Sequence, residues 1–380
     1  MIHTQHQICT RCIMDTTDPE ITFDAQGICN HCHEFDQVTS KRWFPNEEGK
    51  RKLEMLFNKL KEEGKGKEYD CILGLSGGLD SSYLALVMKD YDLRPLVVHV
   101  DAGWNSDDSV KNVQAVVNHC NFELHTKVVN WNEVKDLQLA YLKAGVANQD
   151  VAQDHAFFAS LYHFAIEKDI KYVISGHNFA TESILPSAWQ HAAMDEINLK
   201  DIHKKYGSIR LKEYKTISFF DYYFNYPIIK KMKVLQPLNY MAYSKEIALN
   251  RLKGIGYVPY ERKHGESRFT KFFQNYYLPK KFNIDKRKAH LSSLIVSGFI
   301  TRQEALDKLR EPLYDDSELI QDKDFISNKL GISISELDKY VEGPNRHYSE
   351  FKNWDEKHSF FKQTKNTLEK TIGKFIPIKF

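Results

Sequence analysis

The sequence predicts an α/β protein built on a parallel, doubly wound sheet of five strands. Five short apolar runs alternate with amphipathic helical patterns, and the runs cover residues 70–75, 96–100, 122–129, 172–175 and 234–238. The runs are continuous rather than alternating, so each strand should be buried on both faces by flanking helices. Ligands bind such sheets at the carboxyl ends of the strands, and functional residues are expected there.

Composition and charge restrict the class of protein. The 380 residues are 42% apolar and 13% aromatic, which is typical of an ordered protein with room for more than one domain. The net charge is only +2, so binding to nucleic acid is not indicated. Neither an apolar run of about 18 residues nor an export signal is present, and a cytoplasmic protein without membrane contact is expected.

The first 40 residues predict a zinc ribbon. Two C-x2-C pairs supply four thiols in a chain without an export signal: Cys9, Cys12, Cys29 and Cys32. That spacing is typical of a structural zinc site with four thiolate ligands. A short β-hairpin with its turn at residues 24–27 is expected between the pairs. His31 and His33 flank the last cysteine and are alternative ligands.

The rest of the chain divides into three predicted parts. Residues 41–68 form a helical linker, with an apolar face that includes Leu53 and Phe57. Residues 69–260 form the sheet domain, with an aromatic insertion at about 185–233. The aromatic side chains of the insertion either stack on a base or sugar or form a separate hydrophobic cluster. Residues 261–380 form a substrate-binding and helical C-terminal region.

The stretch from Ser76 to Ser82 follows the first strand and precedes a helix. Its small and polar side chains are Ser76, Gly77, Gly78, Asp80, Ser81 and Ser82. The glycines allow close approach of the backbone to a ligand, and Ser81 or Ser82 is expected to be the N-cap of the helix. Free N–H groups at the helix N-terminus then favour a phosphate or pyrophosphate. The lysine and spacing of a Walker A loop are absent.

This stretch resembles the SGGxDS loop of the PP-loop, or N-type, ATP pyrophosphatases. The resemblance implies an adenine nucleotide alpha hydrolase-like fold in which the loop binds the pyrophosphate of MgATP while an acceptor oxygen is adenylated. Asp80 would hold Mg²⁺ or orient the loop. Asp101 and Trp104, at the end of the second strand, would lie beside adenosine.

Residues 175–183 resemble a second segment of the same family, the GHN…E segment. Gly176 and His177 match it, and Phe179 and Ala180 replace the usual pair of aspartates. Glu182 is the remaining candidate ligand for a metal. The alternative is a helix-capping turn with Thr181 as the N-cap.

A dense polar stretch at residues 260–274 has interleaved aromatic residues. Its polar side chains either bind a nucleotide diphosphate or form a solvated face. The side chains that would hold a sugar nucleotide or act as acid and base are Lys263, His264, Glu266, Arg268 and Lys271.

Over most of its length to about residue 310, the chain resembles the N-acetyl sugar amidotransferases, the LPS/O-antigen biosynthesis branch of the PP-loop superfamily. The resemblance rests on the cysteine module, on residues 76–82, on residues 263–270 and on residues 286–293. It implies that ATP adenylates the N-acetyl oxygen of a UDP-linked sugar and that ammonia displaces AMP to leave an acetamidino group. Ammonia would come from a separate glutaminase subunit, with a cyclase-like partner.

This resemblance defines the predicted site. The predicted catalytic residues are Asp80, Lys263, His264, Glu266 and Arg268. The predicted ATP-binding residues are Ser76, Gly77, Gly78, Asp80, Ser81, Ser82, Asp101, Gly176 and His177.

Two other functions remain open. PP-loop tRNA thiolases also carry an N-terminal cysteine ribbon, but they use further cysteines for sulfur transfer. Only Cys71 and Cys120 are left here, and Gln153-Asp154-His155 stands where such relatives carry a cysteine pair. A zinc-ribbon scaffold that only senses nucleotide is the non-enzymatic alternative.

Overall fold

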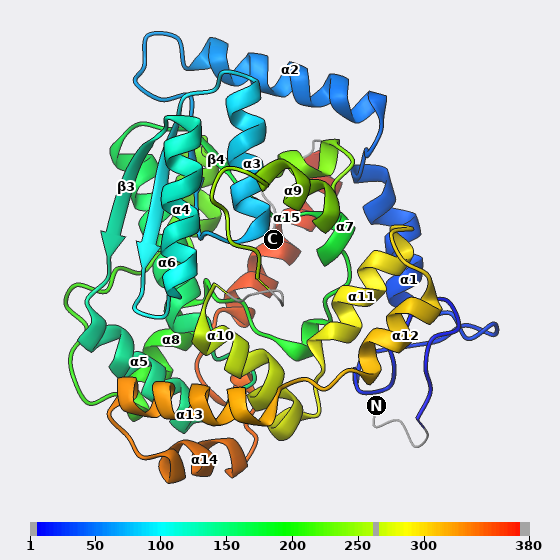
Figure 1. The fold of residues 1–380 in the computed structure, drawn as a ribbon, viewed down its shortest axis with the longest axis vertical. Helices are drawn as coiled ribbons and strands as arrows, with labels where there is room; N and C mark the ends of the chain where they lie inside the picture. The colour runs from blue at the N-terminus through cyan, green and yellow to red at the C-terminus, as the bar shows by residue number, and fades with distance from the viewer. Residues whose placement is uncertain (1–5, 261–265, 373–380) are drawn as a thin grey trace.

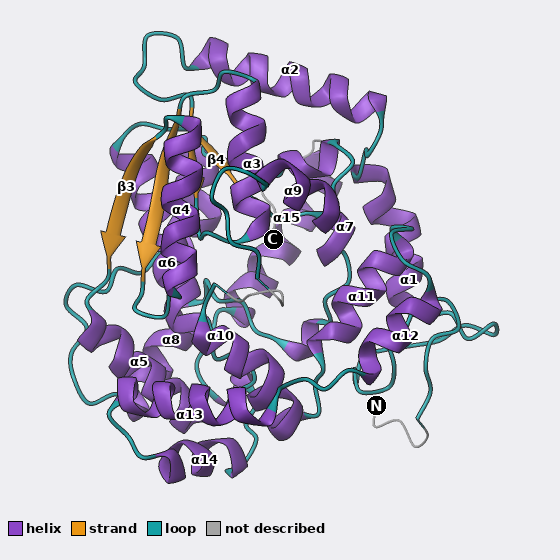
Figure 2. Ribbon diagram, viewed as in Figure 1, coloured by secondary structure: helices purple, strands orange, loops and turns teal. Residues whose placement is uncertain are grey.

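A computed structural model describes residues 6–260 and 266–372 and contains the predicted parallel sheet (Figures 1 and 2). The strands are β1 Cys71–Gly74, β2 Pro95–Asp101, β3 Glu123–Val128, β4 Tyr172–Ile174 and β5 Lys233–Leu235. They lie in the order β3-β2-β1-β4-β5, and every neighbouring pair is parallel. The chain therefore starts at the centre of the sheet and winds outward in both directions. The predicted fold class is confirmed.

Helices account for most of the remaining chain. They are α1 Asn30–Glu34, α2 Glu47–Glu63, α3 Leu79–Asp90, α4 Asp107–Cys120, α5 Trp131–Ala144, α6 Val151–Glu167, α7 Phe179–Glu182, α8 Glu196–Tyr206, α9 Lys245–Leu252, α10 Arg268–Phe272, α11 Lys286–Val296, α12 Arg302–Arg310, α13 Asp316–Leu330, α14 Ile334–Glu342 and α15 Asp355–Ile372.

The two faces of the sheet bury two separate hydrophobic cores. Ile72 of β1 points into the core formed with α5, α6 and α8. Its neighbours Cys71 and Leu73 point into the core formed with α2, α3, α4 and α9. Side chains alternate between the faces of a strand, so both faces of β1 must be apolar. This arrangement explains the continuous apolar run in the sequence.

Helix α2 is packed on the sheet domain rather than extended as a spacer. Asn46 caps it by accepting hydrogen bonds from the backbone N–H groups of Glu48 and Gly49. Leu53 and Phe57 on its apolar face are buried in the second core, as the periodicity predicted.

The aromatic insertion is part of the first core. Tyr214, Phe219 and Tyr226 are buried there, and Trp354 near the C-terminus is buried in the same core. The ring of Trp354 lies against the ring of Phe219, with the two ring centroids 5.8 Å apart. These aromatic residues thus pack hydrophobically, but within the first core rather than in the separate cluster that was expected.

The C-terminal helices close the carboxyl edge of the sheet. In Figure 1 the strand arrows point toward α10 and α13. A third core joins α10, α11, α13 and α14 with the four N-terminal cysteines. Thr301 forms a capping box with Glu304 at the start of α12. The edge of the sheet where ligands are expected is therefore enclosed by residues far away in sequence.

Candidate functional site

The glycine-containing loop after β1 begins helix α3 earlier than predicted. Gly78 is the N-cap, without a side-chain hydrogen bond, and Ser81 and Ser82 lie inside the helix. The prediction that either serine caps the helix was wrong, because Gly77 and Gly78 complete the turn before them. Ser76 Oγ instead accepts from the Gly78 N–H at 3.2 Å, and Ser81 Oγ donates to the Gly78 carbonyl at 3.3 Å.

Gly77 is required by both conformation and space. Its φ is +81°, and a Cβ there would lie 2.4 Å from the carbonyl oxygen of Ser109 in α4. The loop is thus pressed against α4, with the N-terminus of α3 at its end. This is the geometry in which a helix N-terminus binds phosphate.

Asp80 lies in the first turn of α3 and links the two predicted loops. Its carboxylate accepts a short hydrogen bond from the Tyr243 hydroxyl and another from Asn178 Nδ2 at 3.4 Å. Gly176 lies against the same turn, since a Cβ there would be 3.2 Å from the Ser81 nitrogen. Gly176 and Ser81 are 95 positions apart in the sequence. Two distant segments therefore form one surface.

The second loop caps α7 through a residue that was not predicted. Asn178 is the N-cap and accepts from the Thr181 N–H at 3.0 Å, so the assignment of Thr181 as N-cap was wrong. His177 Nδ1 lies 2.6 Å from Glu182 Oε2. Glu182, the candidate metal ligand, thus has His177 as a neighbour.

At the end of β2 the two predicted residues have different surroundings. Asp101 Oδ1 accepts from the Gly103 N–H at 2.7 Å, at the carboxyl edge of the sheet. Trp104 is 1% exposed and packs between Trp131 and Phe269. A fully buried ring has no face for adenosine, so the expectation for Trp104 does not fit the structure.

The start of the C-terminal region pairs with the loop after β2. Ser267 forms an antiparallel bridge with Asn105, and the Ser106 N–H donates to the Glu266 carbonyl at 2.8 Å. Glu266 Oε1 would lie 3.2 Å from a Cβ built on Gly78. A predicted catalytic carboxylate therefore lies directly beside residues 76–82, the loop predicted to bind phosphate and called the phosphate loop below. Lys263 and His264 lie outside the described residues.

Arg268 and Lys271 have partners in α13. Arg268 Nη2 lies 2.6 Å and Lys271 Nζ 2.5 Å from the carboxylate of Asp322, which is 1% exposed. Burial alone would raise the pKa of Asp322, but hydrogen bonds from Lys271, Tyr314 and Arg268 lower it. The positive charges predicted for substrate are thus held in an ion-pair network, and Arg268 has a structural partner.

A polar cluster that the sequence did not predict joins α6 to α10. Gln153 Nε2 donates to Asp150 Oδ1 at 2.6 Å and to Thr270 Oγ1 at 2.7 Å, and Ser267 Oγ donates to Gln153 Oε1. Asp154 follows directly in α6. Polar residues at the start of an otherwise apolar helix were the signal, and only the fold shows that this end lies at the carboxyl edge.

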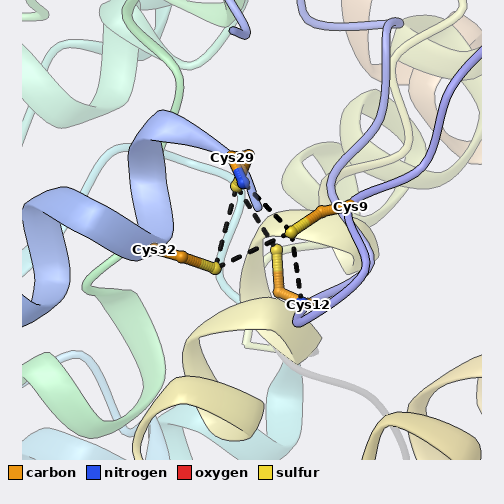
Figure 3. A group of neighbouring side chains, drawn as sticks. All are labelled: Cys9, Cys12, Cys29 and Cys32. Carbon is orange, nitrogen blue, oxygen red and sulfur yellow. Dashed lines mark hydrogen bonds between the residues drawn. The ribbon is translucent and has the colours of Figure 1, made fainter. Parts of the chain in front are cut away.

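The four N-terminal cysteines form one buried cluster (Figure 3). Their Sγ atoms lie 3.6 Å apart for Cys12 and Cys29, 3.8 Å for Cys29 and Cys32, and 3.9 Å for Cys9 and Cys32. A tetrahedral site with metal–sulfur bonds of 2.3 Å requires sulfur separations of about 3.8 Å. The geometry and the donor set therefore fit a metal ion with four thiolate ligands.

The two candidate histidine ligands do not join this cluster. His31 Nε2 lies 2.7 Å from Asp18 Oδ2, and His33 Nε2 lies 2.8 Å from Asp24 Oδ2. The predicted turn at residues 24–27 is present, with the Gly27 N–H bonded to the Asp24 carbonyl at 3.0 Å. Among the described residues, the hairpin around it is reduced to one isolated bridge, between Phe23 and Cys29.

The cysteine module is docked on the C-terminal helices. Arg302 donates to the carbonyls of Cys9 and Cys12 at 3.0 Å each. Lys288 of α11 pairs with Asp15 at 2.5 Å. The module therefore contacts α11 and α12. Helix α11 in turn lies against α7, beside the phosphate loop, because His290 Nδ1 is 2.9 Å from the Thr181 carbonyl.

Comparisons with known protein families matched two parts of the chain. Residues 70–178 match the asparagine synthase family, and residues 266–365 match the family described as LPS biosynthesis protein WbpG-like, C-terminal domain. Comparison with curated proteins gave no match. Within the described residues, no helix has the length and apolar character needed to cross a membrane.

Two solved structures share 14% sequence identity with this chain. One is the NH3-dependent NAD synthetase from Campylobacter jejuni subsp. jejuni NCTC 11168 in complex with the nitrate ion, with a TM-score of 0.30 over 78% of this chain and 98% of that chain. The other is NMN synthetase from Francisella tularensis, with a TM-score of 0.32 over 74% of this chain and 93% of that chain.

The two matches cover separate parts of the chain. Residues 70–178 carry an asparagine synthase-type PP-loop domain, and residues 266–365 carry a domain like the C-terminal domain of WbpG-like LPS biosynthesis proteins.

Proposed function

We propose that this protein is an ATP-dependent amidotransferase acting on the N-acetyl group of a nucleotide-linked sugar. ATP would adenylate the amide oxygen, pyrophosphate would leave, and ammonia would displace AMP to give an acetamidino sugar. The two family matches support an ATP-using enzyme of LPS biosynthesis, and the sugar and its product are the proposal.

One observation carries the proposal. The first residues of the WbpG-like domain pair with the loop after β2, and Glu266 lies beside Gly78 of the phosphate loop. A domain that only recognised a partner would have no reason to reach the triphosphate site. An acceptor held by the C-terminal domain would be presented to the α-phosphate of ATP.

The residues of the phosphate loop suit adenyl transfer. Backbone N–H groups at the start of α3 would bind the departing pyrophosphate, and Asp80 is held at the loop by Tyr243 and Asn178. An amide oxygen is a poor leaving group until it is esterified to phosphate. Mg²⁺ would neutralise the charge that develops on the phosphates, with Asp80 as the carboxylate placed to hold it.

Further partners are part of the proposal. The acceptor would be a UDP-linked N-acetyl sugar in the cytoplasm, and ammonia would come from a separate glutaminase subunit with a cyclase-like partner. We assign zinc to Cys9, Cys12, Cys29 and Cys32 as a structural ion, because four thiolates close its coordination shell.

The cysteines outside the module disfavour tRNA thiolation. Cys71 and Cys120 are both buried in the second hydrophobic core. Burial raises the pKa of the Cys120 thiol to about 11 and raises that of Cys71 further. A thiol that stays protonated at neutral pH is a poor nucleophile for sulfur transfer.

The reaction can be tested directly. The protein is incubated with MgATP and ammonium, with UDP-N-acetyl sugars or with tRNA, and AMP and pyrophosphate are measured. Release that requires the sugar is expected, and release with tRNA alone would contradict the proposal. Asp80→Asn should lower AMP formation by about 100-fold or more. The matched control is Asp90→Asn at the exposed end of α3, which should leave it unchanged.

The metal assignment has a separate test. Elemental analysis should find about one zinc per chain, and a strong chelator should expose residues 1–40 to protease while the sheet domain stays folded. The zinc assignment would be contradicted if the purified chain contained no metal and resisted protease equally well with and without chelator.

A further inference from the structure

Asp154 is a half-buried carboxylate in the first turn of α6. Within residues 6–260 and 266–372 its side chain has neither a hydrogen bond nor an ion pair. Its neighbours are better satisfied: Asp150 accepts from Gln153 and from Thr270. A half-buried carboxylate that lacks donors is costly, and such groups are concentrated at functional sites.

The fold places Asp154 at the carboxyl edge of the sheet. Helix α6 leads directly into β4, so it runs against the strands and its first turn lies where the strands end. One turn further along, the ring of Phe157 would lie 2.6 Å from a Cβ on Gly74, the last residue of β1. The phosphate loop begins two residues later, at Ser76.

A second chain of contacts joins Asp154 to the same place. The adjacent residue Gln153 is hydrogen-bonded to Ser267, and the residue before Ser267 is Glu266, whose carboxylate lies beside Gly78. The first turns of α6, which carry Asp154, therefore contact both the end of β1 and the start of the C-terminal domain that would hold the acceptor.

The charged and titratable groups facing Asp154 come from three elements. Asp150, before α6, and the burial of the site raise the pKa of Asp154 to about 8, with burial the larger cause, and Lys286 at the start of α11 opposes this. The hydroxyl of Tyr214 in the insertion also faces it and donates to the Ala152 carbonyl at 2.8 Å. A carboxylate with such a pKa exchanges a proton near neutral pH, as a general base must.

We propose that Asp154 receives the ammonia nucleophile and accepts the proton that is released when ammonia attacks the adenylated acceptor. The inference rests on the function proposed above. The sequence motifs assigned no role to this residue.

The step is balanced without a further reactant. Ammonia adds to the carbon that bears the O–AMP group, forming a C–N bond and an ammonium group. The carboxylate of Asp154 takes one proton, and the C–O bond to AMP then breaks with its electron pair. The product is an acetamidinium cation, whereas the substrate amide is neutral. Before this proton transfer, the negative carboxylate would stabilise the positive ammonium group of the adduct.

The test separates the two halves of the reaction. Asp154→Asn is compared with the full-length wild-type chain in acceptor-dependent exchange of labelled pyrophosphate into ATP, which reports adenylation, and in amidine formation from ammonium. Exchange should be retained, and amidine formation should fall by about 10²–10⁴-fold. Hydroxylamine should lose less of its rate than ammonia does, because the adduct that it forms is more acidic and gives up its proton more readily without a base.

A second variant tests the role in proton transfer. Lys286→Gln removes the cation that opposes the raised pKa, so the rise of amidine formation with pH should move to higher pH. Glu167→Gln, at the exposed far end of α6, is the matched control and should change neither reaction.

The outcomes are distinct. Wild-type-like amidine formation by Asp154→Asn, or equal loss of exchange and amidine formation, would overturn the assignment and leave the proposed function in place. A wild-type chain that forms no AMP with any N-acetyl sugar would overturn the proposed function, and this inference with it.

Discussion

Two carboxylates at the carboxyl edge of the sheet have opposite surroundings. Asp322 on α13 is 1% exposed and is bonded to Arg268, Lys271 and Tyr314. Asp154 on α6 is half-buried, without a hydrogen bond or ion pair within the described residues. The surroundings lower the pKa of the first and raise that of the second to about 8.

The difference separates a structural group from a functional one. Asp322 holds α10 and α13 together, and its charge is already neutralised by the cations that the sequence had suggested for substrate. The charged form of Asp154 has no ion pair within the described residues and is opposed by burial and by Asp150, so this side chain favours a proton or a cationic ligand. The presence of a charged residue in a motif therefore does not show that it is functional. Its interaction partners in the fold indicate its role.

The largest effect on stability should come from disrupting the ion-pair network of Asp322. Asp322→Asn leaves Arg268 and Lys271 partly enclosed without their shared anion, and we expect a loss of about 3–5 kcal/mol in the free energy of unfolding. Urea unfolding measures it, with Asp324→Asn on the exposed side of the same helix as the control. A loss no larger than that of the control would show that the network contributes little.

The opposite change is expected at the unsatisfied group. Asp154→Asn removes a carboxylate that folding penalises, and we expect a gain of about 1–3 kcal/mol at neutral pH. Urea unfolding at pH 7, with Glu167→Gln as the control, measures the gain. A destabilised Asp154→Asn would mean that the carboxylate has a partner that stabilises the fold.

The two groups should also differ in their dependence on pH. The pKa of Asp154 is raised in the fold, so its penalty begins above the unfolded value of about 4 and grows until pH about 8. The gain from Asp154→Asn should therefore increase from pH 5 to pH 8. The pKa of Asp322 is lowered, so its contribution is fully present across this range and is lost only as the pH falls through the lowered value. Parallel profiles for Asp154→Asn and Asp322→Asn would contradict the comparison.

The smallest effect on stability is expected at a third carboxylate. Tyr243→Phe removes one donor to Asp80 and should cost about 0.5–1.5 kcal/mol in the free energy of unfolding. Since Asp80 would then be held less firmly at the phosphate loop, the KM for MgATP should rise more than the rate of the second half of the reaction falls. Steady-state kinetics with Tyr83→Phe, a tyrosine that packs on Tyr243, provides the control.

The local sequence pattern predicted which helices and strands form more accurately than it predicted the residues at which the helices begin. Helix α4 and the face of α2 agree with the periodicity because an apolar face repeats every three or four residues. The caps were wrong at Ser81, Ser82 and Thr181, because several small polar residues stood in a row and only the turn geometry selects one. The aromatic insertion was ambiguous for a similar reason: an aromatic run does not reveal what it packs against.

The sequence by itself determined the sheet, the phosphate loop and the thiol cluster. Each depends on short-range spacing: continuous apolar runs, glycines at a strand end, and paired cysteines with two residues between them. The tertiary structure decided which charged residues are paired and which are not. Asp322 lies 54 residues from Arg268, and α6 reaches the phosphate loop only because it runs against the parallel strands. Pairing over such distances follows from topology, and a carboxylate can be assigned to structure or to function only once its neighbours are known.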